Sequence, residues 1–237
     1  MQDAIVIALG GSLLSGKSFE ELETWKLGLV NLVESVIDKG MKIFIVVGGG
    51  KLARENIKKS IETGVEDSFE LDLIGIEATR KNAIEVIKLF SDSNINLNQE
   101  IPKTIEDAVR YFENKEIIVM GGTVPGHTTD TVAIKVGNEL NSKMVIVATN
   151  VSHVFTSDPR QNSDAEPIKS MSLDDLGVLT GVGNEINPGS SFAVDPIGVS
   201  IAIEGNLPLV ILDGHDVENL SKAIIGESFE GTRVHGS

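Results

Sequence analysis

The chain has 237 residues, 41% hydrophobic and 23% charged, which is typical of a globular protein with a sizeable core. Its formal net charge of −15 argues against the nucleic-acid backbone as a partner. Every apolar run is shorter than the ~20 residues of a membrane span, and the absence of cysteine excludes disulfides and thiolate zinc sites. Asp3, Gly10 and Gly11 interrupt any secretory signal pattern. We therefore expect a cytoplasmic protein without a membrane partner.

Buried strands alternate with helices along the chain. Continuous apolar runs predict strands at 4–9, 42–47, 116–120, 144–148 and 208–212. Helical spacing of apolar residues predicts helices at 19–39, 52–61, 71–90, 104–113, 130–140, 172–179, 196–204 and 217–225. Residues 151–166 are expected to be irregular, and the glycine-rich segment 181–191 is either a lid or a flexible connector. Continuous rather than alternating apolar strands predict an α/β fold with a parallel sheet covered on both faces.

Each of the first four predicted strands ends in small or polar residues. These ends are Gly10–Gly11, Gly48–Gly50, Gly121–Gly122 and Thr149–Asn150. In parallel sheets, ligands bind beyond the carboxyl ends of the strands, and glycine lets the backbone approach a ligand closely. One such turn means little, because glycine often simply ends a strand. Four turns at one edge favour a binding site.

The stretch from Met120 to Ala133 contains glycines, threonines and a histidine, and leads into a predicted helix. Free amides and the helix dipole make such a junction attractive to an anion. The alternative is a polar turn capped by Thr128, Thr129 or Asp130. Both interpretations stand from these residues alone.

A P-loop pattern, G-x-x-x-x-G-K-[ST], occurs between Gly11 and Ser18. It follows a predicted strand and precedes a predicted helix, so a P-loop nucleotidase is a competing hypothesis. That hypothesis explains none of the other glycine turns and leaves the 120–133 stretch without a role. We therefore interpret Lys17 as a solvated loop lysine.

Nine segments form a more extensive pattern along nearly the whole chain: 10–14, 46–54, 72–76, 79–80, 120–130, 149–151, 155–159, 195–196 and 231–232. In sequence and order they resemble the amino acid kinase family and, within it, the archaeal uridylate (UMP) kinases. The resemblance implies an α/β three-layer αβα sandwich on a mainly parallel sheet, forming a single domain over 1–237. It implies an acceptor-binding part at about 1–142 and an ATP-binding part at about 143–237.

The resemblance also implies an activity: transfer of the ATP γ-phosphoryl group to UMP, giving UDP and ADP, in pyrimidine nucleotide biosynthesis. Mg²⁺ would enter with ATP, no residue is assigned as a protein metal ligand, and a homohexamer is expected. The implied catalytic residues are Lys51 and Asp130. The implied UMP-binding residues are Gly49, Asp72, Thr123, Val124, Pro125, Gly126, His127, Thr128 and Thr129. The implied ATP-binding residues are Gly11, Ser12, Gly50, Arg54, Thr149, Asn150, Phe155 and Asp158.

Four of these residues have structural alternatives. Asp72 and Asp130 also suit helix N-caps, Phe155 suits ordinary core packing, and His127 suits a loop histidine hydrogen-bonded to the backbone. The proposed reaction needs no general base, because the attacking phosphate oxygen of UMP is already anionic. It needs in-line positioning and neutralisation of negative charge by amides, Mg²⁺ and a cation, for which Lys51 and Arg54 are the candidates.

The chain departs from the family pattern mainly on the ATP side. Ala8 and Ser200 stand where many or some relatives have lysine, and Ser152-His153 replaces a commoner Asp-Gly pair. Two further hypotheses therefore accompany UMP kinase. One is a same-fold kinase for another phosphorylated acceptor such as isopentenyl phosphate, against which the 120–130 loop argues. The other is a non-catalytic nucleotide- or oxyanion-binding protein.

Overall fold

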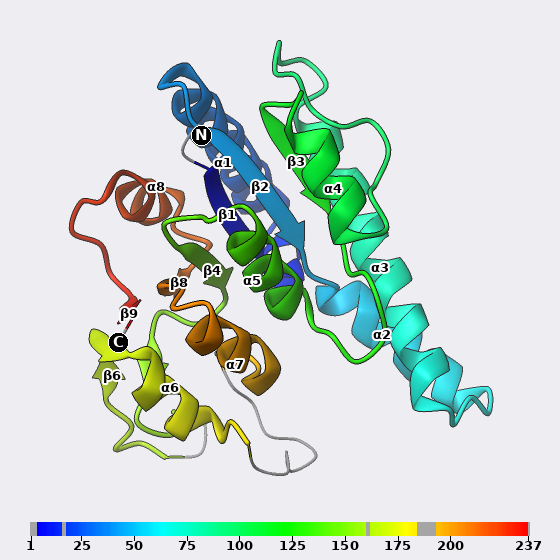
Figure 1. Ribbon diagram of the computed structural model, residues 1–237. Coiled ribbons are helices and arrows are strands. Elements are labelled where there is room, and N and C mark those ends of the chain that lie inside the picture. The colour runs from blue at the N-terminus through cyan, green and yellow to red at the C-terminus, as the bar shows by residue number, and fades with distance from the viewer. Residues whose placement is uncertain (1–3, 16–17, 160–161, 184–192, 237) are drawn as a thin grey trace.

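The computed structural model describes residues 4–15, 18–159, 162–183 and 193–236. Within these ranges the main sheet contains seven strands in the order β3-β2-β1-β4-β8-β9-β7 (Figure 1). Its strands are β1 (Ala4–Leu9), β2 (Lys42–Val47), β3 (Ile117–Met120), β4 (Val145–Thr149), β7 (Ser170–Ser172), β8 (Leu209–Asp213) and β9 (Thr232–His235). A separate antiparallel pair joins β5 (Val154–Phe155) to β6 (Pro167–Ile168).

Helices cover both faces of this sheet. They are α1 (Phe19–Asp38), α2 (Gly50–Glu62), α3 (Ser68–Leu89), α4 (Ile105–Phe112), α5 (Thr129–Glu139), α6 (Leu173–Thr180), α7 (Pro196–Glu204) and α8 (Val217–Ile225), with a 3₁₀ helix η1 at Gly11–Leu14. Successive strand side chains point to opposite faces. Ile7 and Leu9 of β1 join the core under α1, α3 and α8, whereas Val6 and Ala8 join the core under α4 to α7. The predicted three-layer αβα sandwich is confirmed.

The side of the sheet on which successive strands are added changes at β1. From β1 the chain adds β2 and β3 on one side, and then crosses to add β4 and β8 on the other. β1 pairs in parallel with both neighbours, with Val6 opposite Phe44 of β2 and Val145 of β4. A reversal of this kind opens a crevice at the carboxyl ends of the two central strands, where ligands of open α/β sheets bind.

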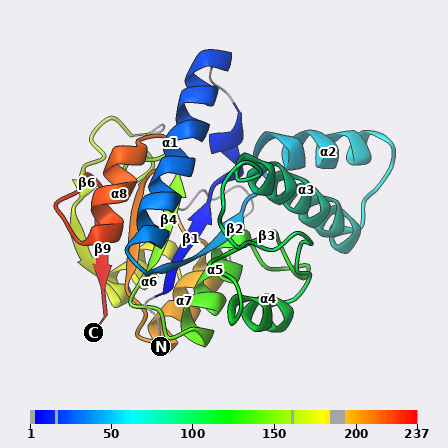
Figure 2. The same cartoon turned by 90° about the horizontal axis from the view of Figure 1, so that it is seen from above.

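Helices α2 and α3 lie side by side and project beyond the sheet (Figure 2). α2 starts directly after the carboxyl end of β2, so its first turn lies at the same edge as the crevice. α3 runs back toward the sheet, and Thr79 and Asn82 in its middle reach the turns after β3 and β2. The cap of α3 is Asp67, whose Oδ1 accepts a hydrogen bond of 2.8 Å from the amide of Phe69. The interpretation of Asp72 as a helix cap is therefore wrong, since Asp72 lies one turn inside the helix.

Several short strands were not expected. Residues 151–166, expected to be irregular, include β5, and β7 and β9 extend the sheet beyond β8. β9 runs antiparallel to β8, so the sheet is mainly but not wholly parallel. Lys17 of the P-loop pattern lies outside the described residues, as do residues 184–191 of the segment expected to be either a lid or a connector.

Candidate active site

The glycine turns after β1 and β2 pack against each other backbone to backbone. A Cβ on Gly11 would lie 2.2 Å from the carbonyl oxygen of Gly48, and a Cβ on Gly50 would lie 2.2 Å from the carbonyl carbon of Gly11. Gly50 also has a φ of +54°, which L side chains rarely adopt. The amide of Gly48 donates to Leu9 at 2.8 Å. Only glycines allow these two turns to meet so closely.

The β4 end lies at the same edge. The amide of Gly10 donates to the carbonyl of Ala148 at 2.8 Å, and a Cβ on Gly10 would lie 3.4 Å from the Cα of Thr149. On the other side, a Cβ on Gly48 would lie 3.4 Å from Oγ1 of Thr129. The turns expected to converge from separate parts of the sequence therefore share one rim.

Side chains of α3 fix the β2 and β3 turns. Nδ2 of Asn82 donates to the carbonyls of Gly48 and Gly49 at 2.8 and 3.0 Å. Oγ1 of Thr79 accepts from the amide of Gly122 at 2.6 Å. The guanidinium of Arg80 donates to the carbonyls of Gly122 and Thr123, each at 3.2 Å. Thr79, Arg80 and Asn82 were not among the predicted site residues.

The loop between β3 and α5 is held at its tip by Asp72. Oδ2 of Asp72 accepts a hydrogen bond of 2.7 Å from the amide of Gly126. Within this loop Thr123, Pro125 and His127 are half-buried, while Val124, Gly126 and Thr128 are exposed. Hydrogen bonds at Gly126 and at Thr123 therefore fix this loop. A loop that is already fixed loses little conformational entropy when it binds a ligand.

Thr128 caps α5, because its side chain accepts from the amide of Thr131. Its hydroxyl also donates to Oδ2 of Asp195, and that of Thr131 donates to Oδ1 of Asp195 at 2.9 Å. Oδ1 of Asp195 in turn accepts from the amide of Gly198, which caps α7. The Asp195 carboxylate therefore links the N-terminus of α5 to that of α7. The sequence predicted Asp195 only as the cap of α7.

Asp130 lies in the first turn of α5. The interpretation of Asp130 as the helix cap is wrong, since Thr128 has that role. Some of its surface remains exposed, but the protein atoms around the carboxyl desolvate it. This desolvation, reinforced by the charge of Asp195, raises the pKa of Asp130 to about 7.

His127 packs its ring against Lys135 of α5, with the lysine Nζ 3.3 Å from Nε2 of the ring. The expected hydrogen bond from its side chain to the backbone is absent among the described residues. Desolvation and the lysine charge lower the pKa of His127, while Asp195 acts in the opposite direction. The loop therefore carries a histidine that favours its neutral form.

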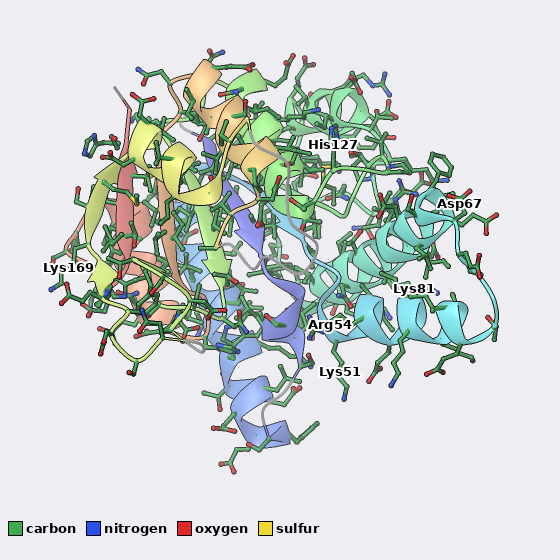
Figure 3. All side chains as sticks on the ribbon, turned by 90° about the horizontal axis from the view of Figure 1, so that it is seen from below. Lys51, Arg54, Asp67, Lys81, His127 and Lys169 are labelled. Atoms are coloured by element: carbon green, nitrogen blue, oxygen red, sulfur yellow. The ribbon has the colours of Figure 1, made fainter. Side chains whose placement is uncertain are left out.

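Lys51 and Arg54 stand on the first turns of α2, directly after the glycine turn of β2. Both are exposed, and the Nζ of Lys51 lies 3.6 Å from Oε1 of Glu55. Figure 3 shows Lys51 extending away from the body of the protein and His127 well apart from both cations. Because exposed pairs of this kind are weak, the lysine is free to turn toward an anion.

A cavity of 410 Å³ lies beyond the end of β4. Its lining includes the four residues predicted to surround the ATP base and ribose, namely Thr149, Asn150, Phe155 and Asp158. Phe155 is only half-buried and faces this space, so ordinary core packing does not describe it. His153 also lines the cavity and was noted in the sequence only as a departure from the family pattern.

The described residues contain neither a metal-binding cluster nor a membrane-spanning helix. No group of three or more histidine or carboxylate side chains there is arranged to hold a metal ion. None of the helices in the same part of the chain has the length and apolarity to cross a membrane.

Comparison with known proteins places this geometry in a family. The model of the amino acid kinase family matches residues 3–213. A uridylate kinase of Methanococcus vannielii is 38% identical over 97% of this chain and 98% of its own length. One of Methanocaldococcus jannaschii is 36% identical over 98% and 99%. The crystal structure of uridylate kinase from Archaeoglobus fulgidus aligns with a TM-score of 0.81 at 30% identity, covering 99% of this chain and 100% of that one. The chain therefore belongs to the amino acid kinase family.

Proposed function

We propose that this protein transfers the γ-phosphoryl group of ATP to UMP, giving UDP and ADP. The observation that carries the proposal is the shared rim, where the turns after β1, β2 and β4 meet the loop that enters α5. Relatives similar over almost their whole length are named uridylate kinases, which favours UMP over isopentenyl phosphate as the acceptor.

UMP binds between the β3–α5 loop, the first turn of α2 and the stretch of α3 from Asp72 to Asn82. The N-terminus of α5 supplies free amides and the positive end of a helix dipole to the UMP phosphate. The hydroxyls of Thr123 and Thr129 add hydrogen-bond donors beside those amides. Asp72 accepts hydrogen bonds from the ribose hydroxyls with the carboxylate oxygen that remains beside its bond to Gly126.

ATP binds with its base and ribose in the cavity beyond β4 and its phosphates along the Gly10–Gly11 turn. This gives the acceptor part, about 1–142, and the donor part, about 143–237, one site at their common edge. The phosphate oxygen of UMP attacks the γ-phosphorus in line, and the bond to the ADP oxygen breaks. No general base is needed, so a neutral His127 does not impede the reaction.

Mg²⁺ enters with ATP. Mg²⁺ in sites of this kind is coordinated chiefly by substrate phosphate oxygens and water. When bound, it neutralises the charge that accumulates on the transferring phosphoryl group. Lys51 and Arg54 add positive charge from α2. Asp130 orients groups at the start of α5, where protonation near neutral pH limits its repulsion of phosphate.

An assay of purified protein with ATP and Mg²⁺ would test the proposal. The acceptor is UMP, CMP, AMP or isopentenyl phosphate, each supplied separately. Rapid ADP release with UMP alone is expected. Binding of UMP without turnover would instead support a non-catalytic member of the fold. Turnover with isopentenyl phosphate but not with UMP would replace the proposed acceptor.

The roles of the α2 cations are tested with a matched control. Lys51→Ala and Arg54→Ala are each expected to lower kcat by about tenfold to a hundredfold, because a cation that stabilises the transition state is lost. Lys58→Ala removes another exposed lysine of α2 that pairs with a glutamate four residues on and is expected to leave kcat unchanged. Equal effects of all three changes would refute a specific role for the first two.

We also propose a cytoplasmic homohexamer acting in pyrimidine nucleotide synthesis. An exposed apolar stripe on α3 supports self-association, since Phe69, Leu73 and Ile84 are 57%, 46% and 44% exposed. Light scattering is expected to give six times the chain mass, and Phe69→Glu is expected to reduce it. A monomer at micromolar concentration would contradict this assembly.

A further inference from the structure

One buried polar side chain has no partner among the described residues. His153 is 5% exposed, and neither of its ring nitrogens makes a hydrogen bond within that part of the chain. Buried polar groups in folded proteins are almost always hydrogen-bonded. A buried imidazole without partners costs folding free energy, so its presence at a binding cavity points to a ligand.

The place of His153 in the fold suggests which ligand that is. It lies between the end of β4 and the start of β5 and lines the 410 Å³ cavity together with Thr149, Asn150 and Phe155. Its ring stands edge-on to that of Phe155, with centroids 6.2 Å apart and planes at 76°. An aromatic face next to a hydrogen-bonding ring is suited to a flat heterocycle.

We propose that His153 hydrogen-bonds the base edge of the donor nucleotide in this cavity. The inference rests on the proposed function, in which ATP is the donor. A neutral imidazole offers one donor and one acceptor, and the adenine edge likewise carries an amino donor beside ring-nitrogen acceptors. The ring nitrogens are covered by neighbouring protein atoms, so the imidazole turns toward the base as the base enters and gains its missing partner.

The unpaired state of His153 predicts opposite effects of one substitution on stability and on binding. His153→Leu keeps an apolar body in the pocket and removes both nitrogens. The unliganded variant is therefore expected to unfold at the same temperature as the wild type or higher. Its affinity for ADP is expected to fall about tenfold, with UMP affinity unchanged. His153→Gln retains a donor and an acceptor and is expected to bind ADP within about threefold of the wild type.

Titration calorimetry with Mg²⁺ and ADP, and separately with UMP, measures these affinities without requiring turnover. Ring ¹⁵N spectra give an independent readout, because the chain has four histidines and the His153 signals are those lost in His153→Gln. ADP is expected to shift these signals in the wild type.

The inference would be overturned if His153→Leu bound ADP with unchanged affinity, or if the ¹⁵N signals of His153 did not shift when ADP is added. A lower unfolding temperature together with weaker UMP binding would show a structural role and would also overturn it. If the wild type binds ADP and shows these effects but transfers no phosphoryl group to UMP, the proposed function fails while the base contact stands. If the wild type binds no ADP, both fail.

Discussion

Replacing Gly11 by alanine tests the close approach of the β1 and β2 turns. The new Cβ would lie 2.2 Å from the carbonyl oxygen of Gly48 and 2.5 Å from the amide nitrogen of Gly50, whereas ordinary contact begins near 3.4 Å. The neighbours are backbone atoms, so a flexible side chain cannot turn away to relieve the clash. The two turns must therefore separate by about 1 Å.

A separation of this size has two expected consequences. Overpacking at such a site costs roughly 1–3 kcal/mol of unfolding free energy. A displacement of about 1 Å in the groups that position two substrates lowers kcat/KM by about a hundredfold. Urea denaturation and a coupled assay of UDP formation measure the two effects.

Gly28→Ala provides the matched control for Gly11→Ala. Its Cβ would meet Val217 at 3.5 Å, an ordinary contact, within helix α1. Alanine is a better helix former than glycine by about 0.5–1 kcal/mol, so this variant is expected to be as stable as the wild type or more so, with normal activity. If Gly11→Ala behaved like Gly28→Ala, the proposed packing of the two turns would be wrong.

Three further changes probe the groups around the rim. Because the pKa of Asp130 is raised to about 7, the folded protein holds a proton that the unfolded chain releases, and stability falls as pH rises from about 4 to 7. In the wild type this proton accounts for a fall of up to about 4 kcal/mol in the free energy of unfolding between these pH values. Asp130→Asn cannot titrate and is expected to lack this fall, which urea denaturation across the range measures. Thr128→Ala loses the α5 cap and the bond to Asp195, and is expected to cost about 1–2 kcal/mol by thermal unfolding. Asn82→Asp turns a carboxylate toward the carbonyls of Gly48 and Gly49, and is expected to cost about 2–4 kcal/mol and to raise KM for UMP.

Conservative variants separate these causes from general damage. Thr128→Ser keeps the hydroxyl and is expected to restore most of the lost stability. Equal losses in Thr128→Ser and Thr128→Ala would show that the methyl group, not the hydroxyl, matters. An Asp130→Asn profile parallel to that of the wild type would refute the raised pKa, and a fully active Asn82→Asp enzyme would refute its role in fixing the turns.

Much of the fold was predictable because its central strands are buried on both faces. A run such as Lys42–Val47 reads as a strand on its own, since both sides of it must be apolar. The outer strand β9 reads differently: buried and exposed residues alternate over four positions, too few to stand out. Pairing with β8 defines it, and that contact is invisible in the sequence.

The glycine turns and the polar loop were also predictable, because glycine and threonine at strand ends have direct physical meanings. The residues that hold those turns were not. Asn82 lies on a helix where its amide is one polar position among many, and only the packing of α3 against β2 brings it to two carbonyls. Asp72 shows the same limitation of sequence reasoning. Its carboxylate could have capped a helix beginning near it, but the structure shows that α3 begins at Ser68. His153 gave a signal only as a departure from the family pattern, because burial without a partner is a property of the folded chain.

The pairing of β1 with β4 limits how the site can open and close. These strands come from the acceptor and donor parts, yet they share a parallel register from Val6 opposite Val145 to Leu9 opposite Ala148, continued by the bond from Gly10 to Ala148. A hinge between the two parts would have to break this ladder. Admission of two nucleotides and release of products must therefore rely on motion of peripheral elements around a fixed centre. Isotope exchange should accordingly find the amides of β1 and β4 protected to the same degree with and without nucleotides.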